Sequence, residues 1–141
     1  ALFHSRIKDI SEFLAEQGLR TDNLKPVDKV VTYHEPCHLC HAQGISKQPR
    51  DLLKAIPGIE FREMKEASWC CGSAATFSLK FTDESQTILD RKLANVQETG
   101  ADLLVTANPG CHLQLAWGLK QAGMPQGVVH VTELLGRATP D

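Results

Sequence analysis

Apolar positions along the chain follow two periods, which predict helices and strands in turn. Phe3, Ile7, Ile10 and Leu14 recur at steps of four, three and four residues, and Gly18 follows as a stop signal. This spacing places the apolar side chains on one helical face, so we expect a helix over residues 3–17. Short apolar runs rich in β-branched residues predict buried strands. The strands are expected at 29–33, 59–64, 103–106 and 128–131, and further helices at 49–56, 74–79, 83–99 and 111–121.

The alternation of strands and helices predicts the fold class. Strands separated by helical crossovers form parallel sheets, and we find no internal repeat or low-complexity tract. We therefore expect residues 1–141 to form a single α/β domain with three layers, a mainly parallel sheet of about four strands flanked by helices. In such sheets, ligands bind beyond the carboxyl ends of the strands. Asp83 and Gln86 indicate a capping box at the start of the helix over 83–99.

Composition narrows the function classes. The 141 residues are 42% hydrophobic and 23% charged, with a net charge of −2, which is typical of a soluble globular protein and offers no basic field for nucleic acid. No apolar run is long enough to span a membrane, and we expect a cytoplasmic location. Five cysteines without a secretory signal favour metal binding or redox chemistry over a disulfide framework.

Four cysteines follow three different predicted strands. Cys37 comes after the first strand, Cys70 and Cys71 after the second, and Cys111 after the third. The carboxyl ends of parallel strands meet at one edge, so we expect these four thiols to form one metal site there. Four thiolates suit either an iron–sulfur cluster or zinc, and an adjacent cysteine pair is unusual for zinc knuckles. Cys71 and Cys111 are also expected to precede helices, whose positive ends favour thiolates.

Other polar residues near the thiols have less specific patterns. Cys40 is an extra thiol that we leave outside the ligand set. Gly72 is expected to let the backbone approach the centre closely. A thiol–disulfide enzyme is disfavoured, because a vicinal disulfide is strained and the C-x2-C lies in a loop. His38 and His112, next to ligand cysteines, are the histidines favoured for a direct role over His34 and His41, whereas Glu35, Arg50, Arg91 and Lys92 are expected at solvated faces.

The spacing Cys37-x32-Cys70-Cys71-Gly72-x38-Cys111 resembles the cysteine-rich CCG domain over about residues 33–135. That domain occurs in heterodisulfide reductase, in lactate-utilisation iron–sulfur proteins and in the glycolate oxidase iron–sulfur subunit. Segments such as WCCGSAATFSL and NPGCHLQL are most similar to its last copy in the glycolate oxidase subunit. The resemblance implies that the chain is a C-terminal fragment of a longer iron–sulfur subunit.

The resemblance also implies a function and its partners. It implies an electron-transfer domain of a flavin-dependent 2-hydroxy-acid oxidase or dehydrogenase, working with a flavin subunit and the rest of its own chain, through which it could lie at the periphery of a membrane. The fragment alone is not expected to be catalytic. The alternative is a structural zinc domain for subunit docking. The full family motif ends in C-x-x-C, whereas Gln114 stands here in place of the last cysteine. Four thiolates favour a cubane [4Fe–4S] cluster or zinc over a non-cubane cluster.

Overall fold

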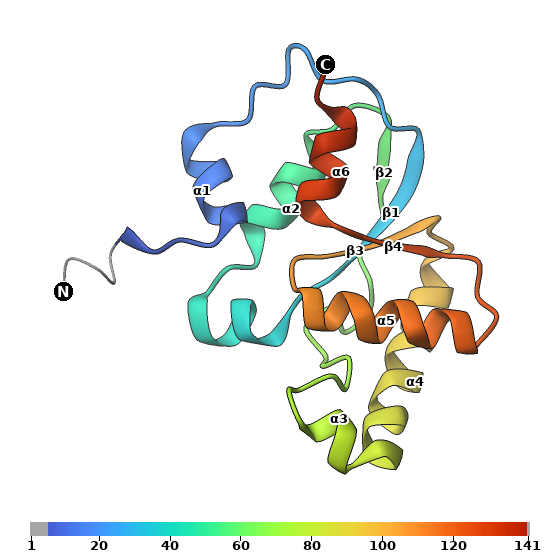
Figure 1. Ribbon diagram of the computed structural model, residues 1–141. Helices are drawn as coiled ribbons and strands as arrows, with labels where there is room; N and C mark the ends of the chain where they lie inside the picture. The colour runs from blue at the N-terminus through green and yellow to red at the C-terminus, as the bar shows by residue number, and fades with distance from the viewer. Residues whose placement is uncertain (1–5, 141) are drawn as a thin grey trace.

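The computed structural model describes residues 6–140 as four strands and the helices around them (Figure 1). Each strand is preceded and followed by a helix, as expected for crossover connections. The order along the chain is α1 (Ile10–Gln17), β1 (Lys29–His34), the π-helix η2 (His38–Ala42), α2 (Lys47–Lys54), β2 (Ile59–Phe61), α3 (Phe77–Lys80), α4 (Thr82–Thr99), β3 (Leu103–Thr106), α5 (Pro109–Gln121), β4 (Gly127–His130) and α6 (Val131–Ala138).

The strands form one parallel sheet in the order β2-β1-β3-β4. Val31 of β1 is in register with Phe61 of β2 on one side and with Leu103 of β3 on the other. The predicted α/β class with a four-stranded parallel sheet is confirmed. β2 is three residues shorter than predicted, because the chain leaves the sheet there and Met64 packs in the core against α4 and α5.

Two hydrophobic cores cover the two faces of the sheet, so the predicted three layers are confirmed (Figure 1). Val31 and Tyr33 of β1 pack with leucines of α2 and α6. Leu104 of β3 packs on the opposite face with leucines of α4 and α5. Successive side chains of a strand point to opposite faces, so Thr32 and His34 point to the α4 and α5 side. None of the helices within residues 6–140 is long and apolar enough to cross a membrane.

The first helix differs from the prediction because of local capping. The predicted helix included Phe3, which lies outside the described residues. α1 begins only at Ile10, since the Asp9 side chain accepts a hydrogen bond from the Ser11 N–H at 2.8 Å and caps the helix. Ile7 precedes this cap and is 62% exposed. The predicted helix is therefore confirmed only over residues 10–17, and of its expected apolar face Leu14 packs against the core whereas Ile10 is 40% exposed.

The helices around the second crossover also differ from the sequence prediction. The capping box at Asp83 is wrong: α4 begins at Thr82, and the Gln86 amide donates to Asp90 one turn further along the helix. α3 starts at Phe77 rather than at residue 74, because Ala74 and Ala75 adopt positive φ angles that a right-handed helix excludes. The π-helix η2 and helix α6 were not predicted.

Candidate metal centre

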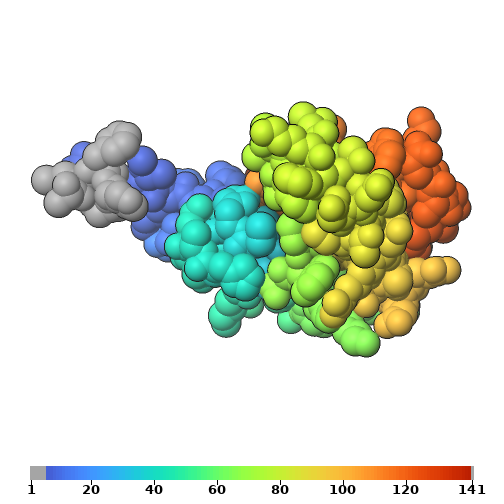
Figure 2. Space-filling view, turned by 90° about the horizontal axis from the view of Figure 1, so that it is seen from below, coloured from blue at the N-terminus to red at the C-terminus, as the bar shows by residue number. Residues whose placement is uncertain are grey.

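The loops at the carboxyl edge of the sheet bring the four predicted cysteines together. Figure 2, seen from below, shows the teal segment that follows β1 beside the green segment that follows β2. Thiol interactions join Cys37 to Cys70, Cys70 to Cys71, and Cys71 to Cys111. All of these cysteines are free thiols, and none forms a disulfide. The four side chains therefore form one continuous series drawn from the three segments that follow β1, β2 and β3.

The glycine after the cysteine pair fixes the pair against α4. Gly72 has a φ of +87°, and a β-carbon at this position would lie 2.5 Å from the carbonyl oxygen of Ser85. The Ser85 hydroxyl donates to the Gly72 carbonyl at 3.0 Å. The Gly72 N–H donates to the sulfur of Cys70 at 3.3 Å. The expected close approach is thus present, with the backbone of α4 as the neighbour and the N–H directed to a ligand sulfur.

Cys111 lies in the first turn of α5, where an asparagine cap holds it. The Asn108 side chain accepts a hydrogen bond from the Cys111 N–H at 2.9 Å, so α5 begins at Pro109, two residues earlier than predicted. The positive end of the helix lies beside this thiol, as expected. Cys71 differs, because a turn and two residues of positive φ separate it from α3. The expectation that Cys71 directly precedes a helix is wrong.

Crowding and burial raise the pKa of three of these thiols, Cys37, Cys70 and Cys71. The interaction with Cys111, followed by burial, raises the pKa of Cys71 to about 11. The neighbouring Cys71 thiol and burial raise the pKa of Cys70, and burial together with Cys70 raises that of Cys37. Adjacent thiolates repel one another, so several ionise together only when a cation is bound among them. Binding of a metal among them would therefore release protons.

His34, the last residue of β1, is the histidine that reaches the thiols. It is 1% exposed, and one of its ring nitrogens lies within 4.8 Å of the sulfurs of Cys71 and Cys111. Neither ring nitrogen has a hydrogen-bond partner among residues 6–140. Burial, with a smaller effect of Lys92, lowers its pKa to about 3, so the ring is neutral and offers a lone pair.

The two histidines that the sequence favoured lie elsewhere. His38 is exposed, and His112 is half-buried at the start of α5, where it interacts with Glu133. The sequence favoured His38 and His112 because each follows a ligand cysteine directly. The structure shows that the position of a histidine in β1 decides instead whether its side chain reaches the thiols. His34 alternates with the core residue Tyr33, so it points to the same face of the sheet as α4 and α5.

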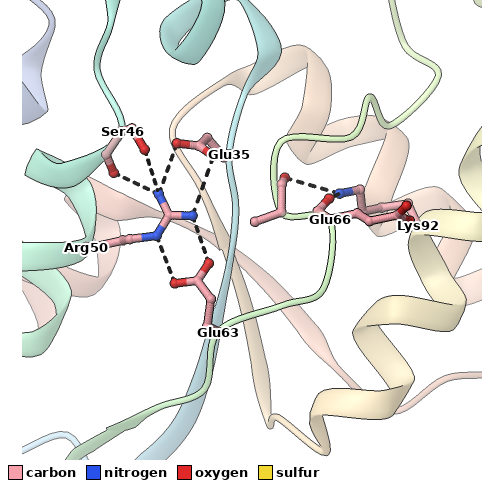
Figure 3. Close-up of polar contacts among 7 residues, drawn as sticks. Glu35, Ser46, Arg50, Glu63, Glu66 and Lys92 are labelled. Carbon is pink, nitrogen blue, oxygen red and sulfur yellow. Dashed lines mark hydrogen bonds and ion pairs between the residues drawn. The ribbon is translucent and has the colours of Figure 1, made fainter.

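A buried ion network anchors the segment before Cys37. The Arg50 guanidinium donates to Glu35 at 3.0 Å and to Glu63 at 2.8 and 2.9 Å, with the Ser46 carbonyl as a further acceptor (Figure 3). Only 15% of the Arg50 side chain and 6% of Glu35 are exposed, so the expected solvated positions are wrong. Burial and the neighbouring Glu35 carboxylate raise the pKa of the Cys40 thiol.

The residues at this edge fit the metal groups expected from the sequence. Four thiols and one neutral imidazole form a donor set that suits an iron–sulfur cluster or tetrahedral zinc. The unpartnered nitrogens of His34 are buried polar atoms, which folded proteins leave without a partner only rarely. A bound group among the thiols would provide that partner.

The cysteine-rich domain model named CCG matches residues 31–116, which is more than half of the chain. The chain therefore belongs to the family of CCG cysteine-rich domains, and the resemblance seen in its cysteine spacing is confirmed. The matched segment runs from β1 into α5 and contains all four cysteines of the series, together with His34.

Curated relatives carry the domain within longer proteins. The chain is 43% identical over 138 residues to the probable glycolate oxidase iron-sulfur subunit of Bacillus subtilis, covering 96% of this chain and 31% of the relative. It is 35% identical to a subunit of the fumarate reductase (CoM/CoB) of Methanothermobacter marburgensis, over 96% of this chain and 28% of that protein. It is 32% identical to lactate utilization protein A of Halalkalibacterium halodurans, over 90% of this chain and 52% of that protein. The chain thus spans about a third to a half of these relatives.

Proposed function

We propose that this chain is an iron–sulfur domain that passes electrons within an oxidoreductase. The observation that carries the proposal is the continuous series of four thiols, closed at Cys71 and Cys111 by a neutral histidine. Names of the relatives support the same class, because one is an iron-sulfur subunit of a probable glycolate oxidase and another belongs to a fumarate reductase. An iron–sulfur cluster, when bound, accepts and releases single electrons.

In this proposal Cys37, Cys70, Cys71 and Cys111 hold a [4Fe–4S] cluster. Cys71 and Cys111 are buried, whereas Cys37 and Cys70 are half-buried and lie at the outer end of the series. The outer thiols lie where an electron would enter or leave with the shortest path to a partner. The Gly72 N–H donates to the Cys70 sulfur and stabilises negative charge there.

The wider assembly forms part of the same proposal. We place the chain in a flavin-dependent 2-hydroxy-acid oxidase or dehydrogenase of the cytoplasm, as the C-terminal domain of a longer iron–sulfur subunit. The flavin subunit would carry out the oxidation of the substrate, and this domain would carry electrons without reacting with the substrate itself. The identity of 43% to the glycolate oxidase subunit over nearly the whole chain supports glycolate-type acids as the substrates of that assembly.

A structural zinc domain is the second candidate, and His34 favours it. Zinc prefers four ligands, and sites with three thiolates and one histidine are common. The placement of His34 with Cys71 and Cys111 provides two thiols and an imidazole within one coordination sphere. In that case the domain would hold its loops rigid for docking to another subunit, and it would have no redox activity.

Metal analysis of anaerobically purified protein tests the proposal. Near-equal iron and acid-labile sulfide, with visible absorption, is the expected result. Cys71→Ser should abolish this absorption, and Cys40→Ser is the matched control that should retain it, because Cys40 interacts with Glu35 rather than with the inner thiols. Stoichiometric zinc without sulfide would reject electron transfer and support the docking role. A His34→Gln variant that loses zinc would then identify the fourth ligand.

A further inference from the structure

A completely buried lysine lies beside the thiol series. Lys92 of α4 is 0% exposed, contrary to the solvated position expected from the sequence. Its ammonium donates to the carbonyl of Glu66 at 2.6 Å and to that of Ala67 at 3.1 Å (Figure 3). The Ala67 carbonyl also accepts the Glu35 N–H, at 3.1 Å. Lys92 thus reaches the turn that leads into Cys70, on the face of β1 opposite the Arg50 network.

No carboxylate neutralises this ammonium in the part of the chain that the structure describes. The Glu66 side chain pairs with Arg91 and accepts a further hydrogen bond from Asn95, so only its backbone carbonyl is directed to Lys92. Arg50, whose side chain is 15% exposed, differs because it contacts two carboxylates. A buried charge without a counter-charge is strongly unfavourable, so an anionic partner for Lys92 is to be expected.

Thiolates at the neighbouring cysteines would supply this negative charge. Among the groups whose charge favours protonated Lys92, Cys71 has the largest effect, followed by Glu66, Cys70 and Cys111. Burial has the largest effect and lowers the pKa of Lys92 to about 8, against the opposing effect of these groups. A centre that carries three or four thiolates has a net negative charge with either metal. Binding of such a centre would therefore provide the counter-charge that the metal-free protein lacks.

We propose that the buried Lys92 ammonium is the resident counter-charge of the metal–thiolate centre, which stabilises the bound centre and, for an iron–sulfur cluster, its reduced state. The inference rests on the proposed metal centre and adds a residue that does not ligate the metal. Lys92 acts through charge, and its two hydrogen bonds to the backbone carbonyls set its position. A one-electron reduction adds negative charge to the centre, so a nearby fixed cation favours the reduced form.

Three variants of the metal-loaded chain test the charge. Lys92→Met removes the ammonium with little change in shape, Lys92→Arg retains a cation, and Lys120→Met removes an exposed cation from the last turn of α5. In a spectroelectrochemical titration, we expect Lys92→Met to disfavour reduction by at least tenfold, which is about 59 mV for one electron. Lys92→Arg and Lys120→Met should stay within about twofold of the parent protein. An unchanged potential in Lys92→Met would overturn the inference.

A structural role of Lys92 gives different results in the same experiment. If the lysine only ties the turn to α4, Lys92→Met would lower the stability of the metal-free chain but leave the potential unchanged. A second neutral variant, Lys92→Gln, keeps an amide donor for the carbonyls, and it should show the same tenfold shift. If neither neutral variant folds, the inference is rejected in favour of the structural role.

The metal content of the parent protein separates the two proposals. Without iron, sulfide or zinc in the parent, the metal centre itself fails, and the inference with it. If the parent holds zinc only, electron transfer fails, and a chelator competition then tests Lys92. In that titration Lys92→Met should bind zinc at least tenfold more weakly than the parent and Lys120→Met. Equal zinc affinities would reject the role of the lysine and leave the zinc centre in place.

Discussion

Replacing Gly72 by alanine should destabilise the loop that carries the cysteine pair. Two terms contribute to the effect. The backbone at residue 72 has a φ of +87°, and a left-handed conformation costs an alanine about 1–2 kcal/mol. The new β-carbon would also lie 2.5 Å from the Ser85 carbonyl oxygen, and overpacking of this kind costs about 1–3 kcal/mol. We therefore expect Gly72→Ala to lower the free energy of unfolding by about 2–5 kcal/mol.

Gly123→Ala is the matched control for this prediction. Gly123 has a φ of +63°, and nothing lies within 4 Å of the position its β-carbon would take. This variant should therefore lose only the conformational term, about 1–2 kcal/mol. Urea unfolding of the metal-free chain, followed by circular dichroism, measures both. Because m is about 1–3 kcal/mol/M in urea, the midpoint of Gly72→Ala should be lower than that of Gly123→Ala by about 1 M.

The same pair of variants also tests the link between the loop and the centre. Displacement of residue 72 from Ser85 moves Cys70 and Cys71, so Gly72→Ala should bind less metal per chain than Gly123→Ala at equal folded fraction. Equal midpoints for the two variants would refute the reasoning, because they would show that α4 yields to the added methyl group at no cost. Equal metal content would show that the loop position does not control the centre.

Three further predictions concern the supports of the site. Arg50→Met should destabilise the fold by about 3–5 kcal/mol in thermal or urea unfolding, because it leaves the buried Glu35 carboxylate unpaired; a loss below about 1 kcal/mol would contradict this. Asn108→Ala should cost about 1 kcal/mol and weaken metal binding, since it removes the cap that holds Cys111; unchanged values would contradict it. Hydrogen bonds from α4 lower the pKa of Glu66 from 4.5 to about 2, so its contribution to stability is complete above pH 4.5 and is lost as the pH falls to 2. Glu66→Gln should flatten this part of the stability curve, and an identical curve would reject the assignment.

The strands and the meeting of the thiols were predictable because both depend on short segments. The run over 103–106 is buried on both faces of the sheet, which favours β-branched and apolar residues without alternation. Parallel strands end at one edge, so cysteines after three strands come together once the sheet forms. Knowledge of the strand order was not needed for this step, since only the shared direction of the strands matters.

Lys92 and His34 were not predictable because their burial depends on segments distant in the sequence. A lysine on an amphipathic helix is normally solvated, and Lys92 is buried only because the turn at residues 65–68 folds over α4. His34 was judged from its neighbours in sequence rather than from the face of β1 that it occupies. Arg50 shows the same effect, because both of its carboxylate partners lie outside its own helix.

The origin of the four thiols in three segments far apart in the sequence bears on the order of assembly. In a site built from C-x2-C pairs, an unfolded chain already holds two ligands close enough to capture a metal ion. Here only the adjacent pair Cys70 and Cys71 is close in sequence, and adjacent residues are poorly placed to chelate one ion. The other two thiols arrive only when β1, β2 and β3 have paired. We therefore expect folding of the sheet to precede insertion of the metal, and in the proposed iron–sulfur domain a factor that delivers the cluster would recognise the folded domain rather than the nascent chain.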